Sequence, residues 1–482
     1  MALILIIILP VIAALLSYIF RKSLLWLSWI AVIVSILELS TALTIVISIL
    51  NGGSIIVHST YYFAIDPLGI ILLMILTLVG TMASVYSVGY IKQEVENKVI
   101  VLYKAHQYFI LLHLFIFAMF FAIMTTSPIL MWIAIEATTL STAFLVSFYN
   151  KPSAIEAAWK YLIINSIGVL LGFFGTLLFL YPTLHANHRG FVNWTLLLNN
   201  ASAFDPFIAK IAFVIVLIGY GTKVGLVPMH PWLPDAHSKA PAPISSLLSG
   251  VLLNVAFFAV LKFKAVTDIA IGSSFSQMLM IFFGILSITV AAFIIFVQKN
   301  YKRLLAYSSV EHMGIIALGF GFGGIGSFAA LLHMIYHSLA KSALFLLSGN
   351  VFIRYNTTKI SEVKGMIKVL PITSVLFFIG FLAITGIPPF GIFITEFTIL
   401  SAGISSHPVI TCIALFSLVL VFTAIIKHIV KMIFGKSDES TSKCEISFLT
   451  VFPPLILIAI LIVLSFFIPQ NLQFLLHAAA AK

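Results

Sequence analysis

The sequence predicts an all-α polytopic membrane protein with about fourteen transmembrane helices. Of its 482 residues, 61% are hydrophobic and only 9% are charged, and the mean hydropathy is +1.18. Soluble domains carry roughly 25% charged residues. The apolar runs leave no room for a soluble catalytic domain, and we assign the net charge of +11 to membrane topology rather than to nucleic-acid binding.

The predicted spans follow one another along the whole chain. They lie at residues 2–20, 25–50, 67–91, 107–125, 128–149, 158–181, 207–229, 241–263, 275–297, 303–322, 326–351, 371–403, 408–434 and 449–468. The first run has neither a basic segment before it nor a small-residue cleavage site after it, so we expect a retained helix and not a signal peptide. The loop 182–206, the loop 352–370 and the linker 435–448 are the main polar connectors.

Two of these spans are interrupted at corresponding positions. Glycines and a proline surround Lys223 in the seventh span, and Thr385-Gly386-Ile387-Pro388-Pro389-Phe390-Gly391 interrupts the twelfth. Broken helices in matching places indicate inverted repeats. We therefore predict N-terminal helices at 1–106, a five-helix unit at 107–263, an inverted five-helix unit at 275–434 and a last helix within 449–482.

The basic residues predict the orientation of the chain. Most of the 26 Lys and Arg fall in loops on one side of the predicted spans. The positive-inside rule makes that side cytoplasmic. With an even number of spans, both termini then lie on the outer face of a prokaryotic plasma (inner) membrane.

Cysteine usage limits the cofactors that the chain can hold. Cys412 and Cys444 are the only two cysteines, and they are far apart. They cannot ligate an iron–sulfur cluster or a zinc ribbon. We therefore expect no cofactor in this chain and no catalytic site of its own. Iron–sulfur clusters, a nickel–iron centre or a quinone would belong to partner subunits.

Lys223 is the residue around which the predicted function is organised. It lies inside an apolar helix, where an ammonium group is costly unless it faces protein or water, so such residues are functional candidates. The weakened helix around it is typical of backbone that lines a polar cavity. We interpret Lys223 as a protonatable group in an ion path; the alternative is a lysine that snorkels to the interface.

A buried glutamate is the predicted partner of this lysine. Glu136 lies in mid-span with no other charge near it in sequence. A buried charge pairs with another or is neutralised. Pairing with Lys223 would let the lysine gain and lose a proton, whereas the alternative is a protonated structural carboxyl.

Three titratable residues form one stripe on the eleventh span. His333, His337 and Lys341 are spaced four residues apart, which places them on one helical face at intervals of about 6 Å. We interpret the stripe as a proton relay. Zinc binding by the two histidines is the rival, but no carboxylate or cysteine accompanies them in sequence, and Lys341 disfavours a cation.

Further polar residues complete the candidate set. Glu396 follows the second helix break and is the candidate terminal proton carrier. Glu156 and Lys160 form a favourable helical pair that either anchors the helix or modulates Lys223. Glu311 and His312 predict a polar pocket on span ten. His230, Asp235 and His237 form a polar cluster in the proline-rich loop, which serves either as a mouth of the proton path or as a hydrogen-bonded plug. Two further carboxylates, Glu38 and Asp66, are expected to be structural.

These stretches resemble a known family. Residues 228–241, Pro-Met-His-Pro-Trp-Leu-Pro-Asp-Ala-His-Ser-Lys-Ala-Pro, strongly resemble the antiporter-like subunits of respiratory complex I and Mrp antiporters. Within that superfamily, residues 134–140, 302–311 and 337–341 resemble component F of hydrogenase-4-type, formate-hydrogenlyase-like complexes. The resemblance covers nearly the whole chain.

The resemblance implies a fourteen-helix fold with two half-channels joined along a central polar axis. By position, Glu136 resembles the family's fifth-helix glutamate, Lys223 its seventh-helix lysine and Glu396 its twelfth-helix ionisable residue. The stripe at 333–341 matches that of the eleventh helix. The sequence departs from the family at Asn254, where many members have an eighth-helix lysine; the only base expected on that helix is Lys262, near its end. The long lateral helix of some larger members is also not expected.

The expected function is proton translocation by a membrane subunit of a multisubunit redox complex of hydrogenase-4 or NADH-dehydrogenase type. Its partners would be other membrane and peripheral subunits, and its coupling ion H⁺, with Na⁺ as an alternative. Two other functions fit the same residues: an Mrp-like cation/proton antiporter subunit and the proton-conducting subunit of an inorganic-carbon uptake system. A purely structural subunit is a third possibility, which the set of buried ionisable residues disfavours.

Overall fold

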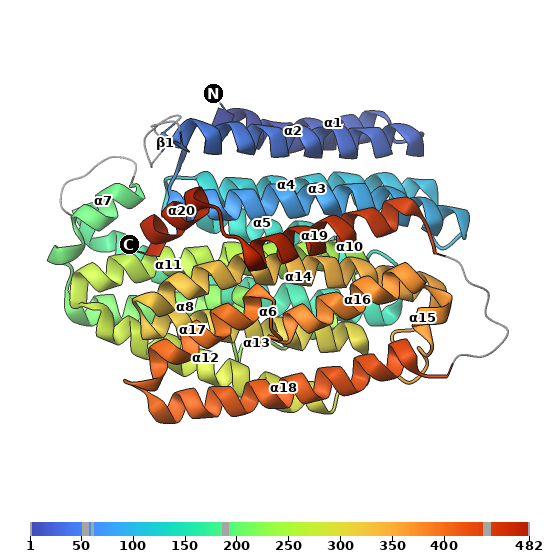
Figure 1. The fold of residues 1–482 in the computed structure, drawn as a ribbon. Helices are drawn as coiled ribbons and strands as arrows, with labels where there is room; N and C mark the ends of the chain where they lie inside the picture. The colour runs from blue at the N-terminus through green and yellow to red at the C-terminus, as the bar shows by residue number, and fades with distance from the viewer. Residues whose placement is uncertain (1, 51–56, 59–61, 186–191, 437–444, 481–482) are drawn as a thin grey trace.

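A bundle of long helices makes up almost the whole protein. The computed structural model describes residues 2–50, 57–58, 62–185, 192–436 and 445–480 (Figure 1). Within these residues, thirteen helices are long and apolar enough to cross a membrane. The prediction of an all-α polytopic membrane protein is therefore confirmed. The membrane-crossing helices are α1 (Ala2–Ile19), α2 (Leu24–Leu50), α3 (Pro67–Glu96), α4 (Leu102–Met124), α5 (Pro128–Val146), α6 (Pro152–His185), α8 (Pro206–Val224), α11 (Leu253–Ile271, continuous with α10, Ala242–Leu247, and the π-helical turn η2, Leu248–Leu252), α12 (Ser273–Phe296), α13 (Tyr301–Phe322), α14 (Ile325–Tyr355), α18 (Pro408–Phe434) and α19 (Phe448–Phe466).

The predicted twelfth span consists of two shorter apolar helices, α16 (Pro371–Ile384) and α17 (Gly391–Ile404). The remaining short elements are α7 (Trp194–Asn199), η1 (Ala201–Ala203), α9 (Trp232–Lys239), α15 (Met366–Val369), α20 (Gln470–Ala480) and the antiparallel strands β1 (Val57–His58) and β2 (Ala64–Ile65).

Both helix breaks expected from the sequence are present. Helix α8 stops at Val224 because Gly225 adopts a left-handed conformation (φ 84°), which a glycine accepts without strain, and its N–H caps the last turn. Gly386 (φ 64°) has the same role between α16 and α17. These breaks expose backbone groups inside the bundle, where they can contact polar side chains.

The segment after the first break differs from the prediction. The sequence analysis treated the residues around Asp235 and His237 as a proline-rich loop, but residues 232–239 form helix α9. Pro234 lies in the first turn of α9, where a missing N–H costs nothing, so its presence does not prevent a helix. The expectation for the eighth span was also too short: α11 continues to Ile271 and therefore carries Lys264 as well as Lys262.

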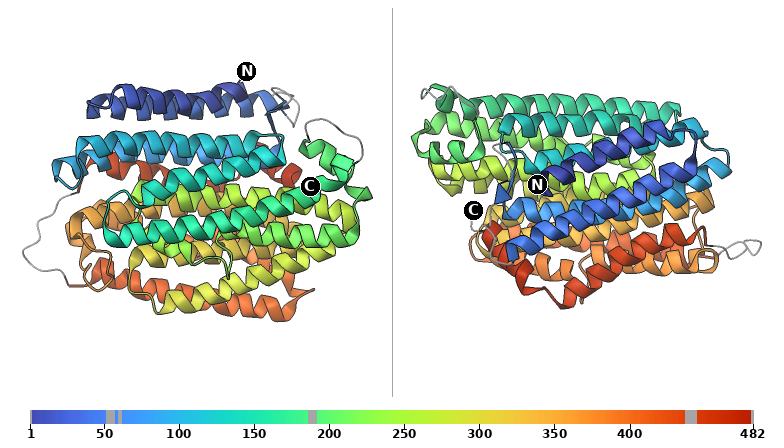
Figure 2. Two further views of the ribbon diagram at one scale, coloured as in Figure 1. Left: turned by 180° about the vertical axis from the view of Figure 1, so that it is seen from behind. Right: turned by 90° about the horizontal axis from the view of Figure 1, so that it is seen from above.

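The helices lie side by side, with α1 and α2 forming a layer on α3 and α4 (Figures 1 and 2). The two ends of the chain are at the same end of the bundle, near α7, whereas α15 lies at the opposite end. Three spans, α10–α11, α13 and α14, each contain an 18-residue stretch that is completely buried within the bundle. These central helices carry the candidates Glu311, His312, His333, His337 and Lys341, so the fold places these residues away from lipid.

Candidate functional site

Lys223 lies in the last turn of α8, beside the first helix break. Its side chain is fully buried, and its Nζ donates hydrogen bonds to Thr139 Oγ1 (2.9 Å) on α5 and to the Tyr161 hydroxyl (2.8 Å) on α6. Nζ also lies 4.9 Å from the centre of the Tyr161 ring. The ammonium group therefore sits in a polar pocket inside an otherwise apolar part of the bundle.

Glu136 is linked to Lys223 through one hydroxyl group. Thr139 Oγ1 donates to Glu136 Oε2 (3.3 Å) while it accepts the hydrogen bond from Lys223. The other carboxylate oxygen, Oε1, accepts from Ser166 Oγ (2.7 Å) on α6. The sequence analysis expected a direct pair between Glu136 and Lys223; instead, Thr139 separates them and connects them at the same time.

Glycines on α6 and α8 make this pocket possible. A Cβ atom added to Gly219 would lie 2.2 Å from the backbone nitrogen of Gly172, and one added to Gly168 would lie 2.5 Å from Thr222 Cβ. The two helices thus approach each other as closely as their backbones permit, as small residues allow in membrane proteins. This close contact brings the end of α8 against Tyr161.

Lys341 is the second buried lysine and has different partners. Its Nζ donates to Ser308 Oγ (2.5 Å) and to the carbonyl oxygen of Leu305 (3.0 Å), both on α13. Glu311, on the same helix, lies within electrostatic range of this ammonium group. Lys341 therefore forms a second polar centre between α13 and α14.

A histidine pair joins the central helices to the second helix break. His312 Nδ1 on α13 lies 2.9 Å from His333 Nε2 on α14. On their outer sides, His312 Nε2 contacts the carbonyl oxygen of Ile384 (3.1 Å), the last residue of α16, and His333 Nδ1 contacts Thr395 Oγ1 (2.8 Å) on α17. The carboxylate of Glu396 reaches within 4.8 Å of both rings.

The outer partners determine the state of the two rings. The Ile384 carbonyl can only accept, so His312 Nε2 must donate to it. The Thr395 hydroxyl lies within hydrogen-bond distance of both the Ile392 carbonyl (2.9 Å) and His333 Nδ1 (2.8 Å), and it can donate to either. When it donates to His333 Nδ1, His333 Nε2 is free to donate to His312 Nδ1 across 2.9 Å. The two neutral rings then form one hydrogen-bonded pair.

Asn254 connects α11 to α14. Its Nδ2 donates to Ser338 Oγ (2.8 Å) on α14 and to its own helix at the Gly250 carbonyl (3.3 Å). Nearby, Ser249 and Ser309 share a hydrogen bond of 2.7 Å between η2 and α13. At the position where the resemblance implies an eighth-helix lysine, the structure thus has neutral hydrogen-bonding groups.

Several buried polar atoms have no hydrogen-bond partner within the described part of the chain. They include both ring nitrogens of His237 and of His337, and Asn254 Oδ1. Buried polar groups are nearly always bonded to protein or to ordered water. These atoms are therefore the places in the bundle where internal water has partners.

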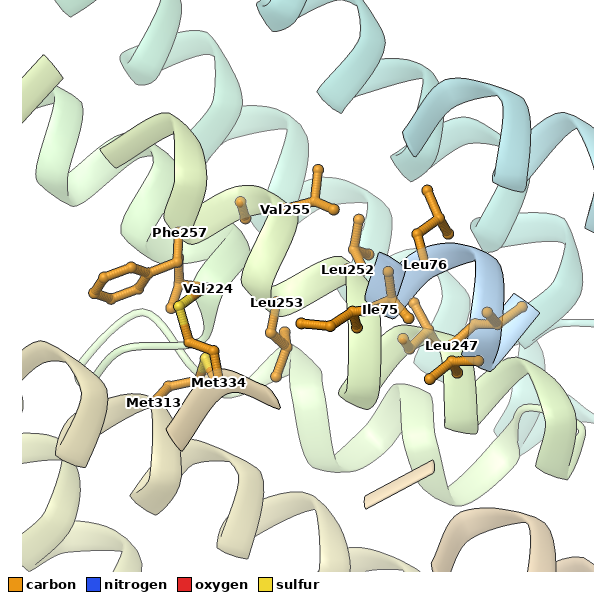
Figure 3. Close-up of a cluster of buried hydrophobic side chains, with 14 of the residues drawn as sticks. Ile75, Leu76, Val224, Leu247, Leu252, Leu253, Val255, Phe257, Met313 and Met334 are labelled. Atoms are coloured by element: carbon orange, nitrogen blue, oxygen red, sulfur yellow. The ribbon is translucent and has the colours of Figure 1, made fainter. Parts of the chain in front are cut away.

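Apolar residues next to the polar ones in sequence pack together. Val224, Met313 and Met334 directly follow Lys223, His312 and His333 in sequence, and all three belong to one buried hydrophobic cluster with Phe257 and Leu253 (Figure 3). The structure shows no direct hydrogen bond, among the residues that it describes, from the Lys223 pocket to Lys341 or to the histidine pair. The three centres are therefore distinct sites rather than one unbroken chain.

The stripe on α14 divides among these centres. His333, His337 and Lys341 are all fully buried. His333 belongs to the histidine pair, the His337 ring lies 5.3 Å from that of His312, and Lys341 bonds to α13. The three residues share a helical face, as the spacing predicts, without touching one another by any described hydrogen bond.

The accessory residues near the first break form an ionic network. Asp235 on α9 pairs with Arg303 on α13 (2.6 Å) and with Lys160 on α6 (3.6 Å), and Lys160 also pairs with Glu156 (2.6 Å). His230 packs against Tyr307, with ring centres 6.0 Å apart. The sequence had assigned no role to Arg303, which ties α13 to α9.

The other candidates make separate contacts. His237 stacks on Phe345 at 4.7 Å and lies within electrostatic range of Lys341. Lys262 pairs with Asp66 (2.5 Å), beside a cavity of about 700 Å³ that Trp194 and Lys264 also line. Asp66 in addition caps α3, as a structural residue would.

Sequence reasoning missed the hydroxyl groups that connect these residues. Thr139, Tyr161, Ser308 and Thr395 hold the predicted ionisable groups, yet serine and threonine occur throughout the spans. The spacing of Thr139 from Glu136, three residues along one helix, was the one local signal available.

The chain is similar to known membrane proteins in most of its length. Residues 125–423, more than half of the chain, match the family model "NADH:quinone oxidoreductase/Mrp antiporter, TM", and residues 54–98 match "NADH-Ubiquinone oxidoreductase (complex I), chain 5 N-terminus". The hydrogenase-4 component F homolog of Methylacidiphilum infernorum (isolate V4) is 36% identical over 400 residues, which cover 82% of this chain and 84% of that protein.

Solved structures show the same fold. A chain of the membrane-bound sulfane sulfur reductase, an archaeal respiratory membrane complex, superposes with a TM-score of 0.87 at 23% identity, covering 99% of this chain and 97% of that one. A chain of the Mrp complex from Dietzia sp. DQ12-45-1b gives 0.86 at 19% identity, covering 100% and 96%. The family match and the identity to the component F homolog together show that this chain belongs to the antiporter-like membrane subunits of the NADH:quinone oxidoreductase/Mrp family.

Proposed function

We propose that this chain is the proton-translocating membrane subunit of a multisubunit redox complex of hydrogenase-4 or NADH-dehydrogenase type. The observation that carries the proposal is the Lys223 pocket: a fully buried ammonium group held by two hydroxyls, with a carboxylate one hydroxyl away. An ammonium group in a membrane bundle is costly, and such groups mark ion pathways.

In the proposed cycle, Lys223 takes up a proton and holds it while Glu136 balances the charge. Thr139 transmits the interaction, because its hydroxyl contacts both groups. Any movement of α8 at the Gly225 break that lengthens these contacts removes stabilisation from the ammonium form and favours release of the proton. The break therefore supplies a natural hinge beside the proton-carrying group.

The proton then passes to the second half of the molecule. Lys341 and the pair formed by His312 and His333 accept it in turn, and Glu396 releases it on the outer side. Water that enters the apolar cluster around Val224 and Met313 would connect the centres, and its exclusion would interrupt them. Asn254 and the unpartnered ring of His337 offer that water hydrogen bonds.

The partners and cofactors follow from the same proposal. Redox chemistry on other membrane and peripheral subunits supplies the energy, and iron–sulfur clusters, a nickel–iron centre or a quinone belong to those subunits. The chain would lie in a prokaryotic plasma membrane with both termini on the outer face. The coupling ion is H⁺, with Na⁺ as the alternative.

A second function has specific support. The fold superposes as well on the Mrp chain as on the respiratory chain, with TM-scores of 0.86 and 0.87. A cation/proton antiporter subunit would use the same lysines. The greater identity to a component F homolog favours the redox complex.

The first test identifies the partners. The tagged protein is purified from native membranes and its partners are identified by mass spectrometry. Hydrogenase-like and iron–sulfur subunits are the expected result. Recovery of only Mrp-type chains, or of one soluble carbon-binding protein, would overturn the redox assignment.

The second test addresses the lysine itself. Lys223→Met should abolish proton pumping by the reconstituted complex, because the side chain keeps its length and loses its charge. Lys210→Met is the matched control, since Lys210 is on the same helix but exposed. Equal pumping by the two variants would exclude Lys223 from the path.

A further inference from the structure

Three metal-ligating side chains converge at the second helix break. His312 from α13, His333 from α14 and Glu396 from α17 each present a ligand atom, and these atoms lie within 4.8 Å of one another. All three side chains are buried, the two histidines completely. The sequence analysis disfavoured zinc at His333 because no carboxylate accompanied it; the fold brings Glu396 to it from another helix.

The hydrogen bonds around the two rings orient them as metal ligands. The outer nitrogens of His312 and His333 contact the Ile384 carbonyl and the Thr395 hydroxyl, which leaves the inner nitrogens pointing at each other. Metal-bound histidines characteristically donate their second N–H to a backbone carbonyl or another fixed acceptor. The orienting contacts of a metal site are therefore already in place.

The charges around the cluster permit a cation. Glu311 lies within electrostatic range of Glu396, so two carboxylates face this region. Lys341 is the opposing charge; it lies eight residues from His333, about 12 Å along α14, and its ammonium group is bound by Leu305 and Ser308. Glu311 also attracts Lys341, so it offsets part of that repulsion.

We propose that His312, His333 and Glu396 form a binding site for Zn²⁺ or a chemically similar divalent transition ion, and that occupancy of the site blocks the proton path. Two histidines and one glutamate are a ligand set that zinc accepts, with the fourth position left for water. Neutral imidazole nitrogens and a carboxylate also suit Co²⁺, which can serve as a probe.

Binding of the ion and conduction of a proton would exclude each other. Two nitrogens bound tetrahedrally to zinc at about 2.05 Å are roughly 3.3 Å apart, whereas here they are separated by 2.9 Å. Zinc must therefore move the rings apart by a few tenths of an ångström. The metal then occupies the space between the two rings through which a proton would pass from one ring to the other.

The test measures metal binding directly and does not depend on pumping. The complex is purified through a tag on this chain and freed of loosely bound metal. Bound zinc is then measured by equilibrium dialysis, and bound Co²⁺ by its visible absorption. We expect one ion fewer in His312→Ala and in Glu396→Gln than in the wild type. Thr395→Val should retain the ligands but bind about 10–100-fold more weakly, because the orienting contact to His333 is lost.

His113→Ala is the matched control. His113 is also a buried histidine, on α4, whose two ring nitrogens have no partner among the described residues. It should bind zinc and cobalt as the wild type does, and the comparison cancels metal bound to other subunits. Unchanged binding by His312→Ala and Glu396→Gln, or an equal loss in His113→Ala, would overturn the proposed site whether or not the complex pumps protons.

Discussion

Thr139 is the residue through which Lys223 and Glu136 act on each other. Its hydroxyl accepts from the lysine and donates to the carboxylate. We predict that Thr139→Val lowers proton pumping by roughly 10–150-fold, since a hydrogen bond to a charged group contributes about 1.5–3 kcal/mol. Pumping by the reconstituted complex is measured with a pH-sensitive dye. Thr139→Ser retains the hydroxyl and should pump nearly normally; if it is as impaired as the valine variant, the hydroxyl is not the reason.

Asn254 provides a second prediction at the level of single residues. We expect Asn254→Leu, which has a similar volume, to leave the complex assembled but to slow pumping by about tenfold through the loss of a buried hydrogen-bonding group. Ser338 keeps its bond to the Met334 carbonyl (2.6 Å), so the substitution creates no unsatisfied hydroxyl donor. Assembly is checked by co-purification. Normal pumping by this variant would show that the transfer between the two halves avoids Asn254.

The sequence could identify the ionisable residues at this scale but not their contacts. Lys223, Glu136 and Lys341 are recognisable because a charge in an apolar run is costly. The partners of Lys341, by contrast, are Ser308 and a backbone carbonyl on another helix. Burying a hydroxyl or a carbonyl group costs much less than burying a charge, and both groups occur throughout membrane helices. The sequence therefore does not distinguish the partners of Lys341 from other hydroxyl and carbonyl groups.

At the scale of elements, the contact between α6 and α8 determines where Lys223 lies. We predict that Gly219→Ala destabilises the protein by about 1–3 kcal/mol, as overpacking typically does, because the added Cβ would lie 2.2 Å from the Gly172 nitrogen. The melting temperature in detergent should fall, and pumping should fall with it as α8 is displaced from Tyr161.

Gly80→Ala is the control for this prediction. A Cβ atom at Gly80 on α3 would meet nothing closer than Ile116 Cδ1 at 3.9 Å. Alanine is a better helix former than glycine, so this variant should melt at the same temperature or higher. A similar loss of stability in both variants would mean that the effect arises from helix glycines in general and not from the contact with α6.

The sequence predicted the two helix breaks but not the short helix α9. Glycine and proline identified both helix breaks, since Gly225 and Gly386 adopt conformations that favour glycine. The same reasoning missed α9. A proline in the interior of a helix breaks it, but a proline in the first turn is tolerated, and Pro234 lies in the first turn of α9. Composition alone does not distinguish these two uses of proline.

At the scale of the whole molecule, hydropathy predicted the number of membrane crossings well. Backbone N–H and C=O groups find no water in the lipid interior, so an apolar segment there forms a helix that satisfies its own hydrogen bonds. Hydropathy could not predict that Glu396 approaches His312 and His333, since Glu396 is on α17, which is distant in sequence from the consecutive helices α13 and α14. The assignment of two inverted repeats at 107–263 and 275–434 stays a prediction.

The orientation of the molecule in the membrane is the last prediction. Ser202, in η1, is exposed at the end of the bundle that holds both termini, whereas Ser361 is exposed near α15 at the opposite end. Because basic residues favour the cytoplasmic side, we expect a membrane-impermeant maleimide to label Ser202→Cys in intact cells. Ser361→Cys should react only after the membrane is opened. Both variants are made with Cys412 and Cys444 replaced by serine, and that background alone should remain unlabelled. The reverse pattern would place both termini in the cytoplasm, and the release of protons through Glu396 would then have to be assigned to the opposite side.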